Sequence, residues 1–177
     1  YSKKFKEHVK GKFIVIGSFR NNLEPKKKNN FENKSIAYLS SGPEYSKNTT
    51  IFEKVNLEGD LYFSPEKKLL PIIKDYCKKN NFKLRIIARS KSKKTFEFEK
   101  KFYDKILPTD NFEFLDTFGG YEKCYKLSDN SNLTICIYSA FGLESVARGN
   151  RTAIFNVRDK VAKMESLKLF WSDKQFP

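Results

Sequence analysis

Short apolar runs alternate along the chain with longer stretches whose apolar residues recur at helical spacing. This alternation predicts a Rossmann-like three-layer α/β domain, with a mainly parallel sheet of about six strands and right-handed crossovers. We expect strands at 12–16, 35–40, 83–88, 112–115, 133–138 and 151–157. We expect helices at 65–79, 97–106, 120–127 and, briefly, between residues 139 and 149.

The remaining segments fit one domain spanning residues 1–177, a length that supports a single packed core. Residues 21–34 and 44–60 are polar or lack periodicity, and we expect them to form long loops near a cleft. The apolar positions within 161–171 predict a last helix packed across the sheet.

The segment 139–149 contains the main candidate site, because it follows one apolar strand and precedes another. Its first residues therefore fall at the carboxyl end of a strand and the start of a helix. Ligands of open α/β sheets bind in that crevice, where free backbone N–H groups and the helix dipole favour phosphate. The candidate phosphate turn consists of Ser139, Ala140, Phe141 and Gly142.

Each residue of this segment also has an ordinary structural interpretation. Ser139 can be a helix N-cap, Gly149 a helix terminator, and Glu144 with Arg148 an i,i+4 ion pair. If Ser139 caps the helix, the capping-box position falls on Gly142, which leaves the Glu144 carboxylate free to accept both hydroxyls of a ribose. A glycine at position 142 would also let the backbone approach a phosphate closely.

Basic residues that follow two other strands form a second set of candidates. Arg89 comes directly after the strand 83–88, so its guanidinium can lie over the cleft and bind a diphosphate or a sugar carboxylate through two hydrogen bonds. Gly17, Ser18 and Arg20 occupy the corresponding place after the first strand. Surface ion pairs are the ordinary alternative for both arginines.

The Glu-x-x-Ala-x-Gly arrangement of Glu144, Ala147 and Gly149, set between two apolar strands, resembles the donor-binding motif in the C-terminal domain of GT-B glycosyltransferases. Three segments are also similar to bacterial surface-carbohydrate biosynthesis transferases. The resemblance extends from about residue 11 to residue 160 and includes 16–22, 36–40 and 142–149.

The resemblance implies an enzyme that transfers a sugar from a nucleotide-sugar donor to a hydroxyl of a carbohydrate or glycolipid acceptor during surface polysaccharide assembly. Glu144 would hold the ribose, the turn at 139–142 would hold the phosphates, and Arg89 or Arg148 would neutralise the leaving group. A GT-B enzyme needs two Rossmann-like halves, so the chain would be the donor half, without the N-terminal acceptor half. No catalytic base is assigned from these residues.

The charge of the chain favours anionic partners without selecting one. Lysine and arginine total 35 against 21 aspartate and glutamate, a formal net charge of +14. Such a surface suits a nucleotide-sugar, an anionic membrane face or nucleic acid. The lysines occur in short groups without the interleaved aromatic residues of single-strand binders, so nucleic acid is the less favoured partner.

Few residues suit metal or cofactor chemistry. The three cysteines are widely spaced, and His8 is the only histidine, in a charged leading segment. We therefore expect no metal and no cofactor, and a reduced cytoplasmic location with peripheral membrane attachment left open. No run reaches the roughly 20 apolar residues that span a bilayer.

Two other functions remain open at this point. A sugar-nucleotide epimerase shares the fold and a similar glutamate motif, but it needs a carboxylate or histidine set at the sugar ring. A basic nucleic-acid-binding domain without enzymatic activity would account for the charge alone, and its binding would be sensitive to salt.

Overall fold

The computed structural model describes residues 18–25, 34–42, 63–108, 112–118, 120–137, 139–155 and 157. Within them, five strands form one sheet in the order β3-β2-β1-β4-β5, and every neighbouring pair is parallel. The strands are β1 (Ser35–Leu39), β2 (Lys83–Ile87), β3 (Phe112–Leu115), β4 (Leu133–Cys136) and β5 (Thr152–Ile154). The helices are α2 (Phe19–Leu23), α5 (Ser64–Lys79), α6 (Lys93–Ile106), α7 (Tyr121–Asp129) and α8 (Ala140–Ala147).

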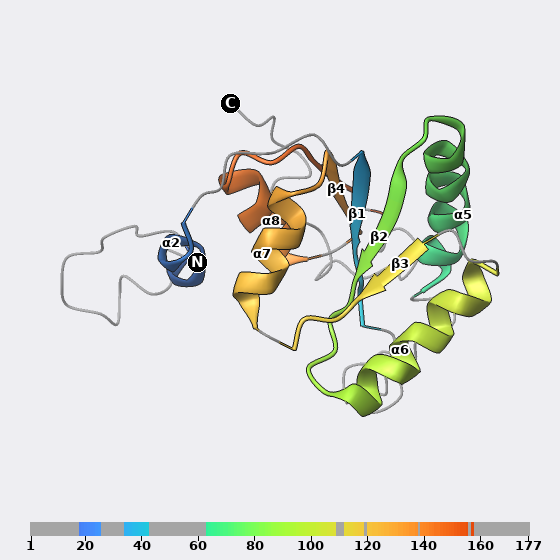
Figure 1. The fold of residues 1–177 in the computed structure, drawn as a ribbon, viewed down its shortest axis with the longest axis horizontal. Coiled ribbons are helices and arrows are strands. Elements are labelled where there is room, and N and C mark those ends of the chain that lie inside the picture. Colours follow the sequence, from blue (N-terminus) through green and yellow to red (C-terminus); the bar gives the residue numbers. More distant parts are fainter. Residues whose placement is uncertain are drawn as a thin grey trace, which may run out of the picture.

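Helices cover both faces of the sheet, which confirms the predicted Rossmann-like three-layer fold. Figure 1 shows α5 and α6 on one side of the sheet and α7 and α8 on the other. The chain leaves β1 toward β2 and β3, and then crosses back to β4 and β5. The order of the strands therefore reverses between β1 and β4, the place where ligands of such sheets bind.

Two apolar clusters, one on each face, hold the layers together. The larger includes Ile36, Tyr38, Leu84 and Ile86 from the strands, packed against residues of α5 and α6. The smaller includes Ala37, Leu39, Ile87 and Cys136, packed against α7 and α8. Every residue of β1 is buried, so the central strand is apolar on both faces, as parallel sheets require.

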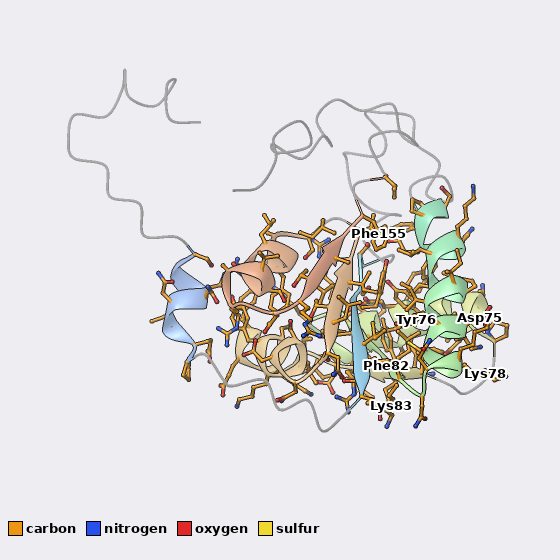
Figure 2. The ribbon with its side chains drawn as sticks, turned by 90° about the horizontal axis from the view of Figure 1, so that it is seen from above. Asp75, Tyr76, Lys78, Phe82, Lys83 and Phe155 are labelled. Atoms are coloured by element: carbon orange, nitrogen blue, oxygen red, sulfur yellow. The ribbon has the colours of Figure 1, made fainter. Side chains whose placement is uncertain are left out.

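An aromatic stack fixes the amino edge of the sheet, opposite the edge where ligands are expected. Tyr76 near the end of α5 stacks on Phe82, directly before β2, with ring centroids 6.2 Å apart. Figure 2 shows both rings between α5 and the start of β2. This contact positions the connection from α5 to β2.

Most element boundaries agree with the sequence prediction, but the helix α2 includes residues 21–23, which were predicted to belong to a loop. Other differences have local causes. The helix α6 begins at Lys93 rather than at Glu97, because Ser92 and Thr95 form a capping box. The helix α5 continues through Pro71. The predicted strand at 12–16 and the predicted helix at 161–171 lie outside the described residues.

Across the described residues, no helix combines the length and the apolar character that crossing a membrane requires.

Candidate functional site

The Glu144 carboxylate brings together residues from three helical segments. Its Oε1 accepts a hydrogen bond from the Ser18 hydroxyl at 2.6 Å, and its Oε2 accepts one from the Tyr125 hydroxyl at 2.7 Å. The Nη2 of Arg20 lies 4.0 Å from Oε1. Ser18 and Glu144 are 126 positions apart in the sequence. Three of the predicted donor-site residues, Ser18, Arg20 and Glu144, therefore meet at one point.

Local structure explains how each partner reaches Glu144. Ser18 is the N-cap of α2. Its Oγ accepts a hydrogen bond from the N–H of Asn21, and its hydroxyl donates one to Glu144. Tyr121 and Tyr125 are four residues apart in α7, so both rings lie on one face of that helix. The helix α7 follows β3, and Tyr121 is its first residue, so this ring lies nearest the carboxyl edge of the sheet.

Two aromatic contacts lie beside the Glu144 carboxylate and its partners. The Arg20 guanidinium lies 4.0 Å from the centroid of the exposed Tyr121 ring, a cation–π contact. The Phe141 ring stacks on Tyr125 with centroids 5.0 Å apart. Neither tyrosine was among the predicted site residues, although two aromatic residues at i,i+4 spacing in the predicted helix 120–127 were a usable signal.

The electrostatics keep the Tyr125 hydroxyl a donor. Burial and the nearby Glu144 carboxylate raise the pKa of Tyr125 well above its usual range. The hydroxyl therefore stays protonated at neutral pH and points its proton at Glu144. The Glu144 side chain is 11% exposed, whereas the Arg20 side chain is 48% exposed, so the cluster is reached by solvent from the Arg20 side.

The expectation that the Glu144 carboxylate is free was wrong. Both of its oxygens already accept a hydrogen bond from a hydroxyl group. A ligand hydroxyl can therefore reach this carboxylate only by replacing one of these donors, and Ser18, the N-cap of the short helix α2, is the more accessible one.

The structure also corrects the expected role of Arg148. Its guanidinium pairs with the Asp129 carboxylate, with Nε 3.0 Å from Oδ1, and both side chains are almost fully buried. Its other nitrogens donate to Asn21 Oδ1 and to the backbone oxygens of Glu24 and Pro25. Arg148 therefore joins α7, α8 and α2 in the interior, where it neither pairs with Glu144 nor faces a leaving group.

Gly142 has a packing role that the phosphate interpretation did not anticipate. A Cβ at this position would lie 2.4 Å from Cys136 Sγ, so only glycine lets α8 approach β4 this closely. The residue is buried, and its N–H donates to the Ser139 backbone oxygen. The close helix–strand contact accounts for this glycine without a ligand.

The start of α8 otherwise has the expected position. Ser139 occupies the N-cap position, but its side chain makes no capping hydrogen bond. Its hydroxyl therefore does not cap the helix, contrary to the ordinary structural interpretation. Ala140 is exposed beside it. Gly149 has a φ of +81°, which confirms it as the residue that ends the helix.

Arg89 lies at the carboxyl edge, as predicted, but on the other side of the central strand. It is exposed shortly after β2, and its Nη1 donates to the Ser41 backbone oxygen at 3.2 Å, just beyond the end of β1. Gly17 lies outside the described residues. In the part of the chain that the structure describes, no three His, Cys, Asp or Glu residues are grouped as a metal site.

Comparison with known proteins adds one finding. Residues 1–176 match the model of a protein family described as a putative O-antigen biosynthesis protein. No curated protein and no solved structure matches the chain. The family match is consistent with a role in polysaccharide biosynthesis and does not name a glycosyltransferase. Because the match covers nearly the whole sequence, the chain belongs to this O-antigen biosynthesis protein family.

Proposed function

We propose that the chain is the donor-binding domain of a GT-B-type, metal-independent glycosyltransferase of surface polysaccharide assembly, and that Glu144 holds the ribose of its nucleotide-sugar. The observation that supports this most is that both oxygens of Glu144 are occupied by hydroxyl groups. A carboxylate whose partners are hydroxyl groups can accept the same kind of hydrogen bond from the two hydroxyls of a ribose.

In the proposed complex, a ribose hydroxyl takes the place of the Ser18 hydroxyl on Oε1, while Tyr125 keeps its hydrogen bond to Oε2. The phosphates then follow the carboxyl edge of the sheet. The start of α8 follows β4 and Arg89 follows β2, with β1 between them. Two strand spacings amount to about 10 Å, a distance that a diphosphate attached to the ribose can cover.

The residues around this path suit the demands of glycosyl transfer. The acceptor oxygen bonds to the anomeric carbon while the bond from that carbon to the phosphate oxygen breaks. The donor domain must therefore hold the nucleotide and stabilise the negative charge of the departing phosphate. Glu144 would serve the first need, and the exposed guanidinium groups of Arg20 and Arg89 would serve the second.

A nucleotide panel tests the proposal. UDP, GDP, CMP and ADP are titrated into the wild-type chain and into Glu144→Gln, with binding followed by calorimetry and thermal shift. Because hydrogen bonds to a charged group contribute about 1.5–3 kcal/mol, we expect one nucleotide to bind and its affinity to fall roughly 10- to 100-fold in the variant. Glu97→Gln, an exposed glutamate in α6, is the control. Binding of none of the nucleotides, or equal binding by Glu144→Gln, would contradict the proposal.

The net charge of +14 also favours a second candidate, a nucleic-acid-binding domain. Binding to random oligonucleotides would then fall steeply with salt and survive Glu144→Gln. In the proposal that we favour, the same charge would instead suit a cytoplasmic protein that attaches to an anionic membrane face, close to a glycolipid acceptor.

A further inference from the structure

A fully buried carboxylate, that of Glu99, lies beneath the carboxyl ends of β1 and β2. It projects from α6 and is 0% exposed. Its Oε1 accepts hydrogen bonds from the Ser40 hydroxyl and from the Arg89 N–H, the latter at 3.1 Å. Its Oε2 accepts from the Ser90 hydroxyl and from the Ser90 N–H, the latter at 3.0 Å. One side chain therefore joins α6 to the residues that follow two neighbouring strands.

These hydrogen bonds continue into the turn that follows β1. The Ser40 Oγ accepts the N–H of Gly42 at 3.0 Å and the hydroxyl of Tyr103 at 2.8 Å while it donates to Glu99. Gly42 has a φ of +70°, which closes the turn. Ser40 thus has a defined set of partners that fixes the direction of each hydrogen bond.

Arg89 is held at both its backbone and its guanidinium group. Its backbone N–H donates to Glu99, and its Nη1 donates to the Ser41 backbone oxygen at 3.2 Å. Displacing Glu99 would release the backbone of Arg89 and, through Ser40, the turn that its guanidinium contacts.

We propose that Glu99 is a positioning residue of the donor site, which fixes the Arg89 guanidinium and the turn at 40–42 at the carboxyl edge. The inference rests on the proposed function, because it assigns Arg89 to the phosphates of the nucleotide. Glu99 itself is fully buried and acts only through its neighbours.

The hydrogen-bond pattern explains why a carboxylate is needed at this position. Each of its oxygens faces a backbone N–H, that of Arg89 on Oε1 and that of Ser90 on Oε2. In Glu99→Gln, one oxygen becomes an NH₂ group, which donates hydrogen bonds and cannot accept one from a backbone N–H. Whichever way the amide turns, it places a donor against one of the two backbone N–H groups.

The first test compares Glu99→Gln with Glu97→Gln, which changes an exposed glutamate of the same helix. Binding of the nucleoside and of the matching nucleoside diphosphate is measured for the best nucleotide of the panel, for example uridine and UDP. We expect Glu99→Gln to weaken diphosphate binding about tenfold and to leave nucleoside binding unchanged, because only the phosphates meet Arg89.

A double-mutant cycle separates positioning from general damage. Arg89→Gln should produce the same selective loss, and the double variant should lose no more than Arg89→Gln alone. Additive losses, an equal loss for the nucleoside and the diphosphate, or no loss in Glu99→Gln would overturn the inference.

Amide hydrogen exchange provides a readout that needs no ligand. We expect exchange at Gly42, Arg89 and Ser90 to become about tenfold faster in Glu99→Gln, with β4 unchanged. If the wild-type chain binds no nucleotide, the proposed function fails, whereas unchanged exchange overturns the role of Glu99 by itself. Should Glu99→Gln not fold, Tyr103→Phe removes only the hydroxyl that donates to Ser40, and unchanged exchange at Gly42 in that variant would overturn the inference.

Discussion

Glu144 and Glu99, two carboxylates on opposite faces of the sheet, differ in the kind of donor that satisfies them. Within the described residues, Glu144 of α8 accepts hydrogen bonds from two side-chain hydroxyl groups and from no backbone N–H, and its side chain is 11% exposed. Glu99, beneath β1 and β2, accepts from two backbone N–H groups as well as from two hydroxyls and is fully buried. A hydroxyl on a short helix can turn away and be replaced by a ligand, whereas a backbone N–H at a strand end cannot. This difference fits the roles that we propose, in which Glu144 binds a ligand and Glu99 positions one.

The largest expected effect comes from removing the structure that holds α2 beside Glu144. Arg148→Met leaves the buried Asp129 carboxylate without its ion-pair partner, and such a change costs about 3–5 kcal/mol. Chemical denaturation should show this loss in the free energy of unfolding. A loss below about 1 kcal/mol would mean that the buried pair is not what joins α2, α7 and α8.

A smaller loss of stability is expected from Gly142→Ala, which tests whether packing alone requires this glycine. The added methyl group would meet Cys136 Sγ, and overpacking of this kind costs about 1–3 kcal/mol. The second change Cys136→Ala should restore part of the stability lost. If Gly142→Ala keeps its stability but loses nucleotide binding, this glycine is needed for close approach to a phosphate and not for packing against Cys136.

The two carboxylates can be compared directly by the same isosteric substitution. Glu99→Gln should lower the free energy of unfolding by about 1–3 kcal/mol, because one buried N–H loses its acceptor. Glu144→Gln should lower it by less than about 1 kcal/mol, because the Ser18 and Tyr125 hydroxyls can rotate and accept from the new amide. Urea denaturation of both variants measures these two losses. A larger loss in Glu144→Gln than in Glu99→Gln would contradict the distinction between the two carboxylates.

The smallest predicted effect concerns the exchange of hydroxyl groups at Glu144. Ser18→Ala removes a competing hydrogen bond with a net contribution of about 0.5–1.5 kcal/mol, so nucleotide affinity should rise roughly two- to tenfold. Calorimetry measures this, with Leu23→Ala as a control at an exposed position of the same helix. Weaker binding by Ser18→Ala would show that Ser18 contacts the nucleotide directly.

The order of strands and helices could be predicted because parallel strands buried on both faces appear as apolar runs. The place of Glu144 followed from the same pattern, since a residue early in a helix that follows a strand lies near the carboxyl edge. Its partners could not be predicted, because Ser18 and Tyr125 meet it only through the packing of α2 and α7.

Other residues had two interpretations that sequence alone cannot separate. A glycine at position 142 suits close approach to a phosphate and close approach to a strand equally well. Arg148 had an acidic residue one turn away in Glu144, but its partner is Asp129 from another helix. Glu99 lies in a strongly charged helix, in which nothing distinguishes a buried glutamate from exposed ones such as Glu97.

The close contact of Gly142 with Cys136 has a consequence for measuring motion in this domain. The Cys136 thiol is 0% exposed and lies directly beneath α8, so an alkylating reagent can reach it only when that helix lifts from the sheet. The rate at which this thiol is labelled would therefore report how often the helix that bears Glu144 detaches from the sheet.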